Sequence, residues 1–148
     1  MKKHTALLLL RLGIGWYFLY AGITKLIDPT WTADGYIKGA QGFLKPLYVF
    51  FGSTNVLPFI NILNEWGLTL IGVALILGVA TRFSAVCGIL LMALYYLALP
   101  FPHPDAHALI VDDHIVFITI FLTLIAFKND DRLSFLPALR NSLPKFLQ

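Results

Sequence analysis

Residues 5–27 read TALLLLRLGIGWYFLYAGITKLI, a long apolar run that contains only two charged side chains. A helix needs about 20 apolar residues to cross the hydrocarbon core of a bilayer, so this run is long enough for a membrane helix. Three further apolar runs cover residues 60–80, 83–99 and 106–127, of which the middle one is slightly short. The sequence therefore predicts an all-α membrane protein, built as a bundle of four transmembrane helices.

The composition also indicates a membrane protein. Of the 148 residues, 58% are hydrophobic and 13% are charged, and the mean hydropathy is +0.77. Soluble domains are nearer half apolar and about a quarter charged. Four crossings use most of the chain, so we expect residues 1–148 to form a single membrane domain. One cysteine, Cys87, excludes an internal disulfide and a Cys-x-x-Cys redox pair.

The positive charges are distributed unevenly between the two predicted sides of the membrane. With four crossings both chain ends lie on one side, and that side holds most of the Lys and Arg residues. They are Lys2, Lys3, Arg11, Arg82, Lys128, Arg132, Arg140 and Lys145, against Lys25, Lys38 and Lys45 on the other side. Cytoplasmic segments carry such an excess, so we expect both termini in the cytoplasm. The cations are scattered at helix ends, which argues against a nucleic-acid partner.

One face of the first predicted helix combines charged and small residues. Arg11, Gly15, Phe18, Gly22 and Lys25 recur at helical spacing and form one stripe. The two glycines allow a neighbouring backbone to approach closely. The charged residues either reach outward to the head groups or face the interior of the bundle. Their shared stripe favours the interior.

The connection over residues 28–59 is long and rich in Gly, Pro and aromatic residues. A structureless loop of that length is uncommon in a compact domain. The segment 43–52 is apolar but too short to span a membrane. We expect one or two interfacial or re-entrant segments over the outer mouth of the bundle, which form either an aromatic belt or a lid.

The start of the last helix determines where three polar residues lie. A helix that began at Asp113 would be short for a crossing, so we expect a start near Pro104 to Ala106, with proline in the first turn. Asp112, Asp113 and His114 would then lie about two turns into the helix. Adjacent residues fan around a helix, so these three cannot all face one spot.

Polar residues gather in the outer third of the predicted bundle, and three interpretations are open. In the first, Lys25 pairs with Glu65 or Asp113 and locks the helices together. In the second, Lys25, Tyr95 and His114 donate hydrogen bonds to a quinone head group, while Glu65, Asp112 and Asp113 relay protons. In the third, His103, His107 and His114 bind a metal with an aspartate. A membrane haem with two histidine ligands is not expected, because the first three predicted helices contain no histidine.

Several motifs resemble the DoxX/DoxD family. They are Leu10-Arg-Leu-Gly-Ile-Gly-Trp-Tyr-Phe-Leu-Tyr-Ala-Gly-Ile-Thr-Lys25, then Glu65 followed by Leu77-Gly-Val-Ala-Thr-Arg82, Trp31 with Gly35–Tyr36, and Val111-Asp-Asp-His-Ile115. The resemblance implies a four-helix protein of a prokaryotic cytoplasmic membrane. In its best-known member type, such a chain is the membrane subunit of a thiosulfate:quinone oxidoreductase that works with a small outer partner subunit. Arg11, Lys25, Glu65 and Arg82 carry the family pattern.

Taken with the resemblance, these residues suggest a quinone-interacting subunit of a membrane oxidoreductase. Lys25, Tyr95 and His114 are expected to bind the head group, and Glu65, Asp113 and His114 to act catalytically as proton carriers. We expect no metal site and see no haem, flavin or iron–sulfur signature. The expected partners are lipids, quinone and a small outer subunit or a larger membrane complex. The alternative is a non-enzymatic accessory subunit of a larger electron-transfer complex, with polar residues that only lock helices together.

Overall fold

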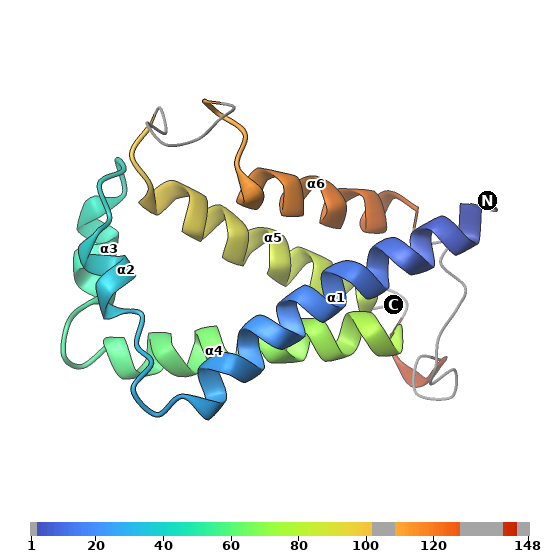
Figure 1. Ribbon diagram of the computed structural model, residues 1–148, viewed down its shortest axis with the longest axis horizontal. Coiled ribbons are helices and arrows are strands. Elements are labelled where there is room, and N and C mark those ends of the chain that lie inside the picture. Colours follow the sequence, from blue (N-terminus) through green and yellow to red (C-terminus); the bar gives the residue numbers. More distant parts are fainter. Residues whose placement is uncertain (1–2, 102–108, 128–140, 145–148) are drawn as a thin grey trace.

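The computed structural model describes residues 3–101, 109–127 and 141–144, and no strand occurs among them. The helices are α1 (Lys3–Ile27), α2 (Asp34–Lys38), α3 (Lys45–Phe51), α4 (Leu57–Leu77), α5 (Thr81–Ala98) and α6 (Asp113–Ala126). The four long helices form a bundle, and the two short ones lie together across one end of it (Figure 1). We call this the cap end, and residues 28–56, which contain α2 and α3, the cap.

Three of the described helices, α1, α4 and α5, are long and apolar enough to cross a membrane. Helix α6 is apolar but has only 14 residues, which gives a length of about 21 Å. The first three predicted helices are confirmed, with boundaries that lie within three residues of those expected. Helix α4 ends earlier than predicted because Gly78 takes a left-handed conformation with φ of 70° and Val79 N donates back to Ala74 O.

The predicted start of the last helix is wrong. Residues 109–112 are not helical, and α6 begins at Asp113, with Asp112 as its N-cap. Asp112 has an extended backbone, and its carboxylate accepts a hydrogen bond of 3.1 Å from Ile115 N. An aspartate in this position satisfies a backbone N–H that has no partner within the helix, which is why the helix starts here.

Helices α1 and α4 pack so closely that their backbones touch. A Cβ atom on Gly22 would lie 2.5 Å from Thr69 N, and one on Gly72 would lie 2.4 Å from Leu19 N. Neither position has room for a side chain. The inward stripe predicted for the first helix is confirmed by the burial of Arg11, Gly15, Phe18 and Gly22, while Lys25 at its end is half-buried.

Helix α6 completes the bundle through its aromatic residues. Phe121 is fully buried, packs against Gly88 of α5, and meets Phe18 of α1 edge to face at a centroid distance of 5.2 Å. Leu75 of α4 and Ala85 of α5 belong to the same core cluster. The core therefore joins all four long helices, although α6 is short.

The cap is attached to α5 through donors that serve carbonyl groups near the end of that helix. Tyr36 Oη donates to Tyr95 O at 2.7 Å, Tyr48 Oη donates to Leu94 O, and Gln41 N donates to Ala98 O at 2.9 Å. The last four carbonyls of a helix have no partner within it, so the bonds to Tyr95 O and Ala98 O supply what the helix end lacks.

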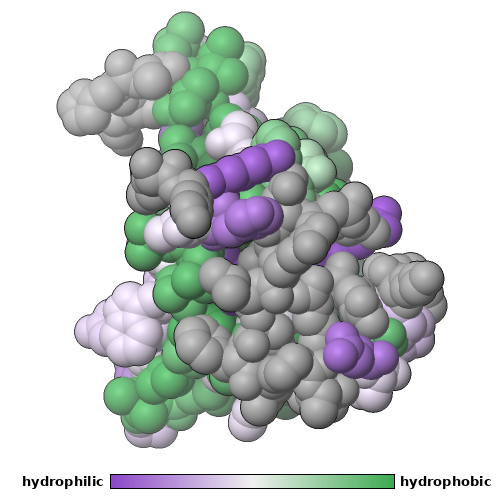
Figure 2. Space-filling view, turned by 90° about the vertical axis from the view of Figure 1, so that its right-hand side faces the viewer, coloured by the Kyte–Doolittle hydropathy of each residue, from purple (hydrophilic) through white to green (hydrophobic). Residues whose placement is uncertain are grey.

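On the other side, Asn61 Oδ1 of α4 accepts a hydrogen bond of 2.9 Å from Ala33 N. The cap thus bridges α4 and α5, and the predicted short segments exist as α2 and α3. The opposite end of the bundle faces the viewer in Figure 2, where a few hydrophilic side chains are visible and apolar side chains lie mainly along the left of the view.

Candidate functional site

Two adjoining cavities lie beneath the cap. The first has a volume of about 290 Å³ and is lined mainly by apolar side chains of α2 to α5, with almost no polar surface. The second, of about 220 Å³, is more polar and is lined in part by Lys25, Trp31 and Thr32. Both cavities share Ala33, Tyr36, Asn64 and Tyr95. We call the two together the paired cavity.

Tyr95 stands at the boundary between the apolar and polar parts of the paired cavity. Its hydroxyl donates to Asn64 Oδ1 at 2.7 Å, and its ring lies 5.6 Å from the ring of Tyr36. Asn64 is 93% buried, with a relative exposure of 7%, and its Nδ2 makes no hydrogen bond within the described ranges. The boundary therefore holds an amide whose donors are available to a ligand.

An Asp–His pair lies on the other side of the Tyr95 ring. His114 Nδ1 is 2.6 Å from Asp112 Oδ2, and the imidazole meets Tyr95 edge to face at a centroid distance of 5.7 Å. An ionised carboxylate only accepts hydrogen bonds, so Nδ1 carries the proton when Asp112 is charged. Asp112 and His114 are both partly buried, and the ring contact places the N-terminus of α6 against Tyr95.

Lys25 provides the cation of the polar part. Its Nζ donates to Ala21 O at 3.2 Å and lies 5.3 Å from the centre of the Trp31 ring. Within the described residues Lys25 forms no ion pair with Glu65 or Asp113, so the structure does not contain the lock that the first of the three interpretations placed between these groups. The ammonium group has three donors and uses one of them on Ala21, which leaves two for the cavity.

The tyrosines of the cap are held in their neutral form. Burial, together with Tyr48, Tyr95 and Asp112 nearby, raises the pKa of Tyr36 well above its ordinary value. Burial also raises the pKa of Tyr48. Both hydroxyls therefore remain protonated at neutral pH and keep donating to the carbonyls of α5.

The structure places the predicted site residues unequally. Lys25 and Tyr95 line the paired cavity, and His114 contacts Tyr95 from behind. Glu65 is half-buried and lines neither part of the cavity, although it follows Asn64 directly. Asp113 is exposed in the first turn of α6. Among the three adjacent polar residues, Asp112 and His114 face the bundle and Asp113 faces away.

Sequence reasoning assigned no site role to Trp31, Tyr36 or Asn64, all of which line the polar part of the paired cavity. The two aromatic residues were assigned to a segment expected to form either an aromatic belt or a lid. Asn64 follows Asn61 by one helical turn, and a pair of amides at the start of an apolar helix is the signal that could have identified it.

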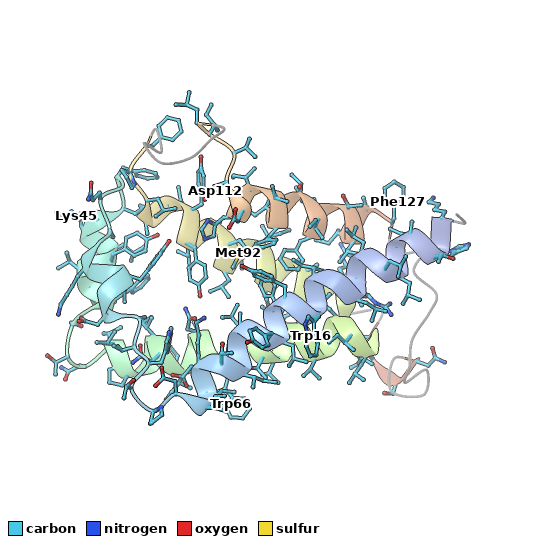
Figure 3. The ribbon with its side chains drawn as sticks, viewed as in Figure 1. Trp16, Lys45, Trp66, Met92, Asp112 and Phe127 are labelled. Atoms are coloured by element: carbon cyan, nitrogen blue, oxygen red, sulfur yellow. The ribbon has the colours of Figure 1, made fainter. Side chains whose placement is uncertain are left out.

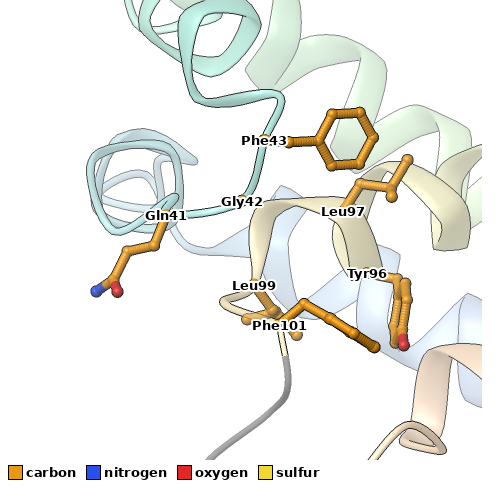
Figure 4. A pocket seen from close by; sticks show the side chains of 7 residues that line it. All are labelled: Gln41, Gly42, Phe43, Tyr96, Leu97, Leu99 and Phe101. Carbon is orange, nitrogen blue, oxygen red and sulfur yellow. The ribbon is translucent and has the colours of Figure 1, made fainter.

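Neither a metal site nor a second hollow among the described residues adds to the paired cavity. No group of three or more His, Cys, Asp or Glu residues in the described ranges could hold a metal ion, and His103 and His107 lie outside them. A hollow of about 400 Å³ lies beside the end of α5, between the 41–43 segment and Phe101 (Figure 4). Its one titratable group, Tyr96, already donates to Ile110 O.

The paired cavity can hold a ligand that has one apolar and one polar end. The polar part offers Lys25 Nζ and Asn64 Nδ2 as donors, with Trp31 as a flat wall. The Asp112–His114 pair, one ring away, can hold a proton on its imidazole. This combination suits hydrogen bonding to carbonyl oxygens and delivery of a proton to them.

Comparison with known sequences gives one match. The sequence model of a family described as DoxX matches residues 6–100, which run from the first turn of α1 to the end of α5 and include the whole cap. No curated protein and no solved structure matches the chain.

Proposed function

This chain belongs to the DoxX family of membrane proteins, and we propose that it is a quinone-interacting subunit of a membrane oxidoreductase. The observation that carries the proposal is the paired cavity, in which an apolar and a polar part meet at Tyr95 and Asn64. A quinone has a head group with two carbonyl oxygens and a long apolar tail, so it needs both environments next to each other.

The groups around the cavity fit a quinone head. Asn64 Nδ2 and Lys25 Nζ lie on the polar part and can each donate to a carbonyl oxygen. Trp31 and Tyr36 offer aromatic faces for the ring, and the apolar part extends between α3 and α4 for the first carbons of the tail. Tyr95 holds Asn64 in place through its hydroxyl.

Reduction of a quinone to a quinol consumes two electrons and two protons. In this proposal the electrons come from a donor oxidised by a partner subunit at the cap end, and thiosulfate is one such donor. The Asp112–His114 pair lies next to Tyr95 and serves as the proton reservoir. Asp113, exposed in the first turn of α6, and the half-buried Glu65, next to Asn64 in the chain, are the further acidic residues to which this proposal assigns proton transfer.

Trp31 allows a direct test of binding. The chain has three tryptophans, so Trp16→Phe with Trp66→Phe leaves Trp31 as the only one. We expect a short-chain ubiquinone to quench its fluorescence saturably in detergent. Adding Tyr95→Phe removes the bond to Asn64 and should weaken binding about fivefold, which corresponds to about 1 kcal/mol. Tyr17→Phe removes a hydroxyl from the outer face of α1 and is the matched control.

Two results would contradict the proposal. Quenching that rises without saturation would show partition of the quinone into the detergent alone. Equal affinity in the Tyr95→Phe and Tyr17→Phe proteins would place the quinone elsewhere. Native mass spectrometry of the gently solubilised protein completes the test, because a large assembly with no quinone on this chain supports the accessory role instead.

A further inference from the structure

One face of α1 is turned away from the rest of the bundle. Leu9, Gly13, Trp16, Tyr20, Ile23 and Ile27 are all exposed, and we call them the α1 strip. They follow one another at alternating intervals of four and three residues, which is the spacing of a seam between two nearly parallel helices. None of them lines the paired cavity.

Exposed apolar residues at this spacing would also fit a helix that faces lipid. The position of Trp16 does not fit a lipid-facing helix. Tryptophan belongs near the membrane surface, where its N–H meets water or head groups. Trp16 lies nine residues from Lys25 and thirteen from Lys3, which places it about 13 Å and about 20 Å from the charged residues at the two ends of α1. It is therefore deep in a hydrocarbon core of about 30 Å, and it is 62% exposed.

Trp66 shows the contrast within the same molecule. Gly22 of α1 meets Thr69 of α4 and Gly15 meets Ile76, so the antiparallel helices bring Trp66 to the level of Lys25. Figure 3 shows the same order, with Trp66 nearer to the cap than Trp16. The exposed Trp66 thus lies at the level of an interfacial belt, whereas Trp16 does not.

The polar atoms of the α1 strip have no partner within the described chain. Neither Trp16 Nε1 nor Tyr20 Oη makes a hydrogen bond there, and their rings lie 6.4 Å apart on successive turns. An indole N–H that faces hydrocarbon without an acceptor is costly. A protein surface that supplies an acceptor removes this cost.

We propose that the α1 strip is the contact surface of a two-fold homodimer, in which α1 packs against α1 of a second copy. Both copies have the same orientation in the membrane, so the two-fold axis runs along the membrane normal and equal residues lie at equal depth. Such a surface must match itself in charge, in shape and in hydrogen bonding.

The α1 strip meets all three conditions. It carries no charge, because Arg11 is buried and Lys25 turns toward Ala21 and Trp31. Gly13 has open space around it, with nothing within 4 Å of a Cβ at that position, and the bulky Trp16 is one turn away. Trp16 of one copy can therefore fill the hollow at Gly13 of the other. Tryptophan only donates and a tyrosine hydroxyl also accepts, so the strip carries a donor and an acceptor.

Cross-linking in native membranes tests the dimer. In a Cys87→Ser background, Leu9→Cys or Ile23→Cys places a single thiol on the α1 strip, and Leu90→Cys on exposed α5 is the control. Under copper phenanthroline we expect the two strip variants to form a species of twice the 16.6 kDa chain mass and the control to form none. Trp16→Phe keeps a ring but loses the N–H, and should lower the dimer association constant about threefold.

The outcomes separate the possibilities. No product above the Leu90→Cys level overturns the proposal, and so does a product of any other mass, which would assign the strip to a different subunit. Gly13→Leu should lower the yield for Leu9→Cys further, because it fills the hollow. Size-exclusion chromatography of the Trp16→Phe and Gly13→Leu proteins verifies that each remains folded, and unchanged yields in both overturn the proposal.

Discussion

The contact between α1 and α4 and the region beneath the cap are held together by different means. Along the first, Gly22 and Gly72 remove side chains so that the backbones meet. Beneath the cap, α4 and α5 are joined by hydrogen bonds from the cap, with the paired cavity between them. Apolar burial drives helix association only weakly in lipid, so membrane helices are held by close packing or by hydrogen bonds. Close packing holds α1 against α4, whereas the hydrogen bonds of the cap hold α4 and α5 on either side of the paired cavity. The difference indicates a rigid half that supports a half able to admit a ligand.

The largest expected effect is at Gly72. Gly72→Ala would place its Cβ 2.4 Å from Leu19 N, and the backbone of α1 has to move for it to fit. We expect a loss of stability of about 1–3 kcal/mol or more, as for other overpacked sites. Thermal unfolding in detergent measures it, with Gly67→Ala as control, since no atom lies within 4 Å of a Cβ there. Equal unfolding temperatures for the two variants would contradict the close packing of α1 and α4.

A smaller and more local effect is expected at Asn61. Asn61→Ala removes the acceptor for Ala33 N and frees the cap from α4. Loss of one such hydrogen bond costs about 1–3 kcal/mol when a group is left unsatisfied. Hydrogen exchange should rise about tenfold or more in α2, while the buried part of α1 is unchanged. Asn55→Ala, at an exposed position in the same region, should leave both rates as they are. Faster exchange in α1 would mean that the cap and the packed half unfold together.

The smallest expected effect depends on pH. The pKa of Tyr36 is raised in the folded protein, so the neutral hydroxyl favours folding. Its contribution is complete below the ordinary tyrosine pKa of about 10, and it is lost as the pH rises through the higher folded value. Unfolding temperatures followed by tryptophan fluorescence should therefore fall above pH 10. Tyr36→Phe should be less stable at pH 8 and should decline less steeply, and parallel curves for both proteins would rule out Tyr36 as the source.

The sequence was sufficient to predict the long helices and the buried face of α1, because small residues and long apolar runs allow few alternative structures. Arg11, Gly15, Phe18 and Gly22 share a helical face, and a glycine-containing face in a membrane helix packs against a neighbour, as observed. Helices α1, α4 and α5 followed from their length and hydropathy. The predictions that both termini are cytoplasmic and that α6 also crosses the membrane remain predictions.

The predictions failed where a local hydrogen bond, rather than segment length or charge, determines the structure. The expectation of a full crossing moved the last helix toward residue 106, although Asp112 is a typical N-cap and determines the observed start. The interpretation in which Lys25 pairs with Glu65 or Asp113 assumed that opposite charges at one depth meet. Lys25 instead turns to a carbonyl on its own helix and to Trp31. The bonds of Asn61 and Tyr36 connect residues far apart in sequence, and no spacing rule indicates them.

If α6 crosses the membrane as predicted, its short length affects the surrounding lipid. It has 14 residues where α1 has 25, so the described helix is about 16 Å shorter than α1. A bilayer adapts to such a mismatch by local thinning, which draws head groups and water inward beside the short segment. Since α6 begins at Asp113, the thinned zone lies next to the Asp112–His114 pair. Protons could then reach this pair from the flank of the protein, through a dimple in the membrane, with no pore through the bundle.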